Sequence, residues 1–233
     1  MLYNIFGDNM KLIKEIENEI NGYRDAKIYQ FNKKLLNLEK EPFNKDILLG
    51  VRMPHLRKIA KKYESLINDD ILLYFLKNKV HEYRLFSLII MTNKNTNEVI
   101  DLYLENLSYV DNWDLVDLSA PRILGKFLYE NKNINESLSY LEYLYQNENP
   151  FIRRVAIVST LYFIKRSRCE IIKFLKITIK DSYYLNHKAL VWMLREIGKL
   201  DKPLMLDFIK NNQCPRITIN YASEILSSIE KKS

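Results

Sequence analysis

The sequence predicts an all-α protein, an α-solenoid of stacked helix pairs, and three observations support this fold class. Apolar residues recur at helical spacing along the 233 residues, and no alternating run is long enough to be a strand. Proline, glycine and capping residues divide the chain into segments of helical length. Near-apolar segments also recur, with Arg84 and Arg154 70 residues apart and Arg154 and Lys188 34 apart. Helix pairs at this period are typical of α-solenoids, so we expect one domain over residues 1–233.

In the first part of the chain we expect a loose lead-in over residues 1–9, ended by Asn9 as a helix cap. Residues 37–53 are the least regular stretch and are expected to form a long loop. Pro54 then stands in a first helical turn, where proline is favoured. The helices expected here cover residues 9–22, 25–36, 54–63, 69–77, 81–91 and 97–107.

Residues 112–128 contain the most unusual helical segment. Trp113 and Asp117 are four residues apart, so they share a face of the helix. A large aromatic surface beside a carboxylate is suited to holding a cation. The alternative is a packing tryptophan and a solvated or capping acid. Pro121 lacks an N–H group, so either the helix kinks there or a new one starts.

The later near-apolar helices carry an unusual set of side chains. One helix of each solenoid pair lines the concave side, and Arg153, Arg154, Lys188 and Trp192 belong to these inner helices. We therefore expect a curved superhelix with a concave basic groove that can hold a nucleic-acid backbone. The helices expected in this part cover residues 134–146, 150–163, 168–180, 187–198, 202–212 and 215–231.

Composition excludes several classes of protein. The net charge of +7 favours a polyanionic partner, although lysine is also common in AT-rich genomes. Two cysteines do not make a disulfide framework, so we expect a reduced cytoplasmic location. Apolar runs are too short for a membrane span. The sequence has no zinc-ligand spacing and no glycine-rich phosphate loop, so we expect no metal and no cofactor. We also expect a monomer.

Four blocks of sequence together resemble the DNA alkylation repair family, the AlkD-type HEAT-like-repeat DNA glycosylases. The resemblance covers about residues 25 to 228. The blocks are Gly50-Val51-Arg52-Met53-Pro54 with the basic helix after it, Trp113-Asp114-x-x-Asp117 with Ser119-Ala120-Pro121, Arg153-Arg154-Val155-Ala156-Ile157-Val158, and Lys188-Ala189-x-x-Trp192-Met193-Leu194-Arg195-Glu196.

The resemblance implies a monofunctional enzyme that removes cationic alkylated purines, such as 3-methyladenine and 7-methylguanine, from double-stranded DNA while the lesion stays in the duplex. It makes Asp117 the acid near the anomeric carbon, and Trp113 and Trp192 the residues that contact the lesion's sugar. It assigns Arg154 to the DNA backbone, with Arg153 and Lys188 beside it, and Tyr29 to the family's additional groove tyrosine.

These residue types fit the chemistry, because a cationic base leaves without protonation and the sugar acquires oxocarbenium character that a carboxylate stabilises. Departures from the family pattern keep alternatives open, and one of them is Asn220, near a place where another arginine is common. Val191 stands where glycine is common before Trp192, and Phe151 where tryptophan is common. The alternatives are a non-catalytic HEAT-repeat protein that binds damaged or bent DNA, and a protein-binding HEAT scaffold.

Overall fold

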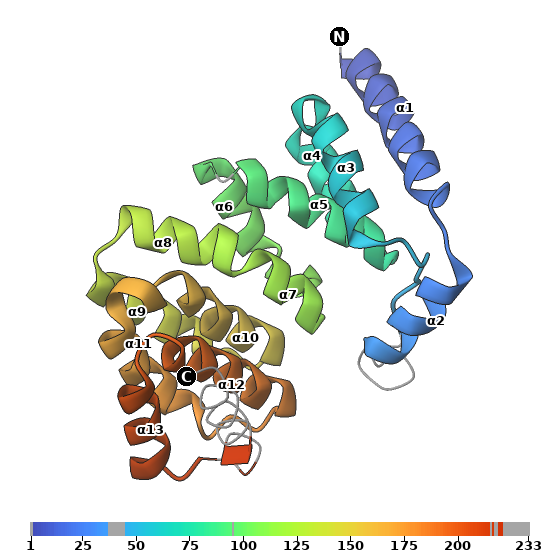
Figure 1. The fold of residues 1–233 in the computed structure, drawn as a ribbon. Helices are drawn as coiled ribbons and strands as arrows, with labels where there is room; N and C mark the ends of the chain where they lie inside the picture. The colour runs from blue at the N-terminus through green and yellow to red at the C-terminus, as the bar shows by residue number, and fades with distance from the viewer. Residues whose placement is uncertain (1, 37–44, 95, 215, 217–218, 221–233) are drawn as a thin grey trace. The chain divides into compact units, whose positions relative to one another are not determined.

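The computed structural model describes residues 2–36, 45–94, 96–214, 216 and 219–220, with the backbone alone for residues 2–8. All regular elements of the described residues are helices, apart from one isolated bridge between Ile47 and Val80. The predicted all-α class is therefore confirmed. The chain forms two compact units, Met1–Ser119 and Ala120–Ser233, which are considered separately below (Figure 1).

The first unit is built around α5, which packs most extensively against three other helices of the unit and also touches α6. It contacts α3, α4 and α7, while α1 packs on α3. Phe75 of α4 and Phe86 of α5 are fully buried, with ring centroids 5.0 Å apart. The helices of this unit are α1 (Leu2–Asn21), α2 (Ala26–Leu35), α3 (Met53–Tyr63), α4 (Asp69–Leu76), α5 (His81–Lys94), α6 (Asn97–Glu105) and α7 (Trp113–Ser119).

The segment before α3 is held by one buried carboxylate. Glu82 of α5 accepts hydrogen bonds from the backbone N–H groups of Leu49, Gly50 and Val51, at 2.9, 2.8 and 3.3 Å. Gly50 has φ of 80°, and its carbonyl accepts from the N–H of Asp25, the N-cap of α2, at 3.2 Å. A Cβ at position 50 would lie 2.4 Å from the carbonyl oxygen of Asp25. Glycine is therefore required where this segment meets the start of α2.

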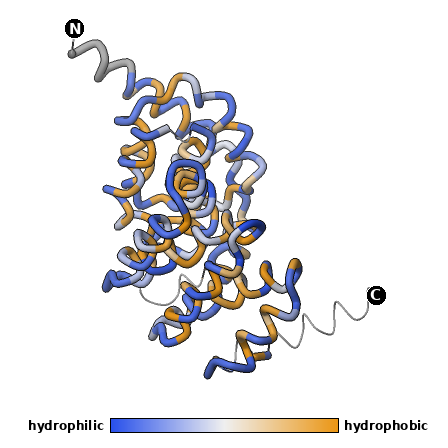
Figure 2. The backbone as a smooth tube through the Cα atoms, turned by 90° about the vertical axis from the view of Figure 1, so that its left-hand side faces the viewer, coloured by the Kyte–Doolittle hydropathy of each residue, from blue (hydrophilic) through white to orange (hydrophobic). Residues whose placement is uncertain are grey.

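The second unit consists of consecutive helices that pack in pairs, α9 on α10 and α11 on α12. The helix α12 also contacts α10 and α13. Figure 2 shows hydrophobic and hydrophilic residues interspersed along the helices of the chain, as amphipathic packing requires. The elements are the π-helical turn η4 (Pro121–Gly125), α8 (Lys126–Asn131), α9 (Ile134–Tyr145), α10 (Pro150–Ser159), α11 (Ile164–Thr178), α12 (Tyr184–Gly198) and α13 (Lys202–Asn211).

Most predicted helices are confirmed, although some of their ends differ from the prediction. The first helix begins at Leu2 and not after Asn9, because Leu2, Ile5 and Phe6 continue its apolar spacing. At Pro121 the helix ends and a π-turn follows, in which the N–H of Gly125 donates to the carbonyl of Ala120 at 2.9 Å. The helix predicted over 215–231 falls largely outside the described residues. None of the described helices is both long and apolar enough to span a bilayer.

Candidate functional site

The helix α7 places Trp113 and Asp117 at partly exposed positions one turn apart. Asn112 immediately precedes the helix, and its side-chain oxygen accepts a hydrogen bond from the N–H of Trp113 at 2.8 Å. Leu115 and Val116 are fully buried and anchor the opposite side of the helix. The structure therefore brings the indole and the carboxylate onto one accessible face, as the spacing predicted.

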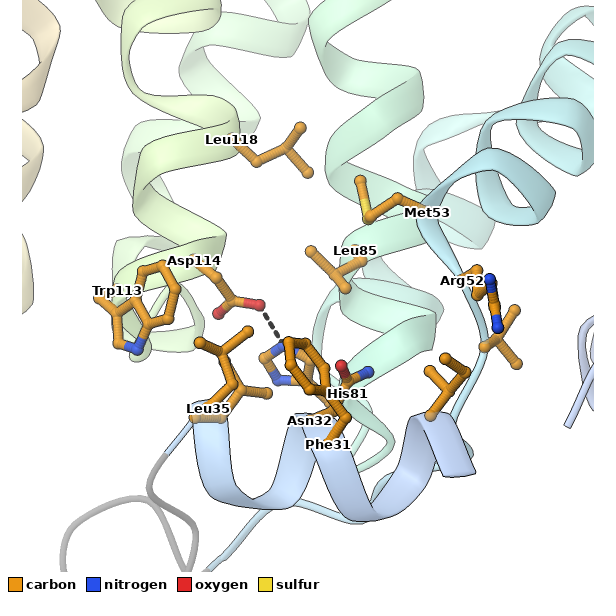
Figure 3. Close-up of a pocket in the computed structure, with 13 residues that line it drawn as sticks. Phe31, Asn32, Leu35, Arg52, Met53, His81, Leu85, Trp113, Asp114 and Leu118 are labelled. Carbon is orange, nitrogen blue, oxygen red and sulfur yellow. Dashed lines mark hydrogen bonds and ion pairs between the residues drawn. The ribbon is translucent and has the colours of Figure 1, made fainter. Parts of the chain in front are cut away.

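A cavity of about 380 Å³ lies next to this helix within the first unit (Figure 3). Its walls come from α2, from the segment before α3, from α5 and from α7. Trp113 lines one end, and Phe31 and Leu35 of α2 point into the space from below in the view of Figure 3. Tyr29, another predicted site residue of the first unit, lies on α2 and is partly exposed, but it does not line the cavity.

A buried histidine at the base of the cavity joins two segments of the unit. The Nδ1 of His81 lies 2.8 Å from a carboxylate oxygen of Asp46, and its Nε2 lies 2.7 Å from one of Asp114. Burial alone would lower the pKa of His81, but the carboxylates of Asp114 and Asp46 override it and raise the pKa to about 10. Arg84 adds ion pairs to Asp46 and Asp111. At neutral pH the raised pKa favours the imidazolium form of His81, in which both ring N–H groups donate to the carboxylates.

This pKa shift predicts how stability depends on pH. The folded-state pKa of His81 lies above its ordinary value of 6.5, so its contribution is complete below about pH 6.5 and is lost as the pH rises towards 10. We expect the thermal denaturation midpoint of the protein to fall across this range. The His81→Gln variant should show a flatter pH profile by circular dichroism. Parallel profiles for the two proteins would contradict the shift.

In the second unit, Arg153 is engaged in an internal ion pair. Its Nε and Nη2 donate to the two carboxylate oxygens of Asp181, at 2.9 and 3.0 Å. Asp181 also accepts from Tyr145, from Asn186 and from the N–H of Tyr183. Burial alone would raise the pKa of Asp181, but Arg153 and the other donors hold it below its usual value. This bidentate pair joins α10 to the start of α12.

The other predicted residues of the second unit differ in their accessibility. Arg154 is 4% exposed and donates to the carbonyl oxygen of Leu185. Lys188 is exposed, with its ammonium 4.7 Å from the centroid of the Tyr184 ring. Trp192 is partly exposed on α12. Because α10 packs against α12, these side chains come from neighbouring helices. Lys188 and Trp192 are thus the more accessible members of the set.

Comparisons with known proteins agree with this fold. The family model described as "DNA alkylation repair enzyme" matches residues 12–226. The chain belongs to this family. A search of curated protein sequences gives no significant match.

Three solved structures are similar to the chain. One, described as a predicted DNA alkylation repair enzyme from Enterococcus faecalis, is 15% identical, with a TM-score of 0.67 over 86% of this chain and 95% of that one. AlkD2 from Streptococcus mutans is 14% identical, with a TM-score of 0.58 over 94% and 97%. The smu.31 protein of Streptococcus mutans UA159 is 15% identical, with a TM-score of 0.57 over 83% and 96%. At these sequence identities the structural similarity supports only the fold, which is that of a helical repeat protein.

Sequence reasoning about this family member missed the His81 cluster. Its members Asp46, His81 and Asp114 are more than thirty residues apart in sequence. The one sequence signal for the cluster is the set of polar residues at the start of the otherwise apolar helix that begins at His81. Within the described residues, no group of three His, Cys, Asp or Glu side chains is placed to hold a metal ion. The predicted concave basic groove stays a prediction.

Proposed function

We propose that this family member is a DNA glycosylase that hydrolyses the N-glycosidic bond of cationic alkylated purines in double-stranded DNA. The observation that carries the proposal is the partly exposed pair of Trp113 and Asp117 on α7, in a chain of the DNA alkylation repair family. Apolar packing alone would not favour a carboxylate one turn from a partly exposed indole. A developing cation would be stabilised by both groups.

The reaction needs no general acid. A purine alkylated at N3 or N7 carries a positive charge, so it leaves with the electrons of the glycosidic bond and becomes neutral. The sugar acquires oxocarbenium character as that bond stretches. The carboxylate of Asp117 would stabilise this charge and orient a water whose oxygen bonds to the anomeric carbon, with the water's proton passing to the carboxylate or to solvent. Trp113 would add its indole face to the same transition state. Trp192, in the second unit, is the other sugar-contacting tryptophan that the family resemblance implies.

We further propose that Lys188 is the leading DNA-backbone contact of the second unit, because its ammonium group is accessible. Arg154 remains a candidate for the same role through its guanidinium, part of which binds the Leu185 carbonyl. Arg153 would act mainly by holding α12 through Asp181, and Tyr29 would contact DNA from α2.

The Lys188→Ala variant tests this assignment. A lysine that contacts a phosphate releases a counterion, so its loss should lower the slope of log affinity against log salt by about one. The measurement is duplex binding by fluorescence anisotropy at several salt concentrations, with Lys173→Ala on α11 as the matched control at another exposed position. If the slope of log affinity against log salt is unchanged in Lys188→Ala, this lysine does not contact a DNA phosphate.

Release of methylated base from alkylated duplex DNA under single-turnover conditions tests the proposed function. We expect 7-methylguanine and 3-methyladenine to appear well above the spontaneous rate. Salt-dependent DNA binding without base release would instead favour the non-catalytic DNA-binding protein, for which Val191 beside Trp192 is the relevant departure. Absence of both activities would favour the protein-binding scaffold.

A further inference from the structure

Two buried cations of α5 contact the start of α7. His81 and Arg84 are three residues apart in the first turn of α5, so they share a face of that helix. Arg84 forms an ion pair with Asp111 and donates to the carbonyl oxygen of Tyr109 at 3.2 Å. The Nε2 of His81 lies 2.7 Å from a carboxylate oxygen of Asp114. The two cations therefore hold the chain on both sides of the first residue of α7.

That first residue is Trp113, which lies between the two bound acids in the sequence. Asp111 is two residues before it, and Asp114 is the next residue after it. The two carboxylate oxygens of Asp114 face different partners, because one accepts from the N–H of Leu115 at 2.9 Å and the other faces His81. Figure 3 shows Trp113 and Asp114 on the same helix, with the contact from Asp114 to the imidazole marked. The backbone that carries the indole is thus fixed from both directions.

The helix α7 depends on such contacts because it is short. It has seven residues, whereas isolated helices shorter than about 12–15 residues are only marginally stable in water. Leu115 and Val116 are fully buried and attach the helix to the unit, but apolar packing is not directional. Hydrogen bonds and ion pairs have preferred directions. The ionic contacts from α5 are therefore suited to setting the orientation of α7.

We propose that His81 and Arg84 are positioning residues, which fix the start of α7 so that the indole of Trp113 and the proposed catalytic carboxylate meet the lesion's sugar in one orientation. The inference rests on the proposed glycosylase function. Both cations are buried, so they act through α7 and not by contact with DNA. A displacement of about 1 Å at a reacting group can cost about 10²-fold in rate, so a loosened α7 should slow excision.

A carboxylate outside α7 provides a matched control. Asp46, in the segment before α3, contacts both His81 and Arg84, and its side chain is 8% exposed. Asp46→Asn should therefore weaken the cluster while the contacts from α5 to the start of α7 remain. Asp114→Asn should weaken the cluster on the α7 side. We expect both variants to lower the urea denaturation midpoint, so that a general loss of stability is present in each.

The fluorescence of Trp113 reports on its position without any reaction. In a Trp192→Phe background Trp113 is the remaining tryptophan. The raised pKa of His81, about 10, keeps this residue protonated at neutral pH. Under that condition we expect acrylamide to quench Trp113 more strongly in Asp114→Asn and in His81→Gln than in the background protein. Asp46→Asn should leave the quenching constant unchanged.

Excision tests whether this positioning matters to the reaction. We expect single-turnover release of 7-methylguanine to fall about 10–10²-fold in Asp114→Asn and in His81→Gln. Affinity for unmodified duplex, measured by anisotropy, should stay within a small factor of wild type. Asp46→Asn should excise much faster than Asp114→Asn, although its urea midpoint is also lowered. If the rates instead follow the losses of stability and Asp46→Asn is as slow as Asp114→Asn, the inference is wrong.

The two readouts separate this inference from the proposed function. If the wild type releases methylated base and Asp114→Asn matches it in both excision rate and quenching, the positioning role is wrong and the glycosylase proposal stands. If the wild type releases no base, the glycosylase proposal fails, and the quenching comparison alone decides whether α5 holds Trp113. Stronger quenching in Asp114→Asn but not in Asp46→Asn would then support that contact, and equal quenching would contradict it.

Discussion

Replacing Asp117 with asparagine is expected to lower the rate of base excision about 10²–10³-fold while DNA affinity stays within a small factor of wild type. Loss of one preorganised group that stabilises transition-state charge typically costs roughly 2.7–4 kcal/mol. Asparagine keeps the size of the side chain and removes the charge. The partly exposed position of Asp117 makes a folding defect unexpected. The measurement is single-turnover release of 7-methylguanine from alkylated duplex, with anisotropy for binding.

Two controls sharpen this result. Asp101→Asn changes an exposed acid on α6 of the same unit and should excise at the wild-type rate. Substrates whose leaving base is neutral should react far more slowly than cationic ones with both the wild type and Asp117→Asn, because the mechanism contains no general acid. If Asp117→Asn excises the base at the wild-type rate, this carboxylate takes no part in the reaction.

Replacing Asp181 with alanine is expected to destabilise the protein by about 3–5 kcal/mol, because it leaves the partly buried Arg153 without its counter-ion. Asp181 has a fully buried side chain and accepts hydrogen bonds from four residues that link α9, α10 and α12. The change is measured as a shift in the urea denaturation midpoint followed by circular dichroism. Asp207→Ala, at an exposed acid on α13 that accepts a hydrogen bond from Asn211 of the same helix, should shift the midpoint little.

The double variant Arg153→Ala with Asp181→Ala separates an unpaired charge from simple loss of packing. Removing both charges should recover part of the stability lost in Asp181→Ala. The same variants address DNA binding. If Arg153 acts only by holding α12, adding the double substitution to Lys188→Ala should leave the salt slope of DNA binding at the value measured for Lys188→Ala alone. If the losses in free energy of unfolding of the two single variants sum to the loss of the double variant, Arg153 and Asp181 are not energetically coupled.

Local signals in the sequence predicted the helices well. Asp25, Asn68 and Asn133 cap their helices through side-chain hydrogen bonds, and such caps depend on residues three positions away or fewer. The face shared by Trp113 and Asp117 follows from helical periodicity alone. These features could be predicted because each is decided within a turn of helix.

Contacts between distant segments could not be predicted in the same way. The partners of His81 lie 35 and 33 residues away, and Asp181 lies 28 residues from Arg153. Which of two adjacent arginines is buried depends on how α10 meets α12, and the sequence does not encode that orientation locally. The cavity likewise arises from four elements brought together by packing.

Gly50 has a consequence for genetics. The backbone of this residue touches the start of α2 so closely that even a methyl group would collide with the carbonyl of Asp25 and the N–H of Tyr29. A single codon change to alanine would therefore displace the helix that supplies Phe31 and Leu35, although position 50 contributes no side chain to the cavity. In a screen for sensitivity to methylating agents, we expect alleles at this glycine to be recovered alongside those at Asp117.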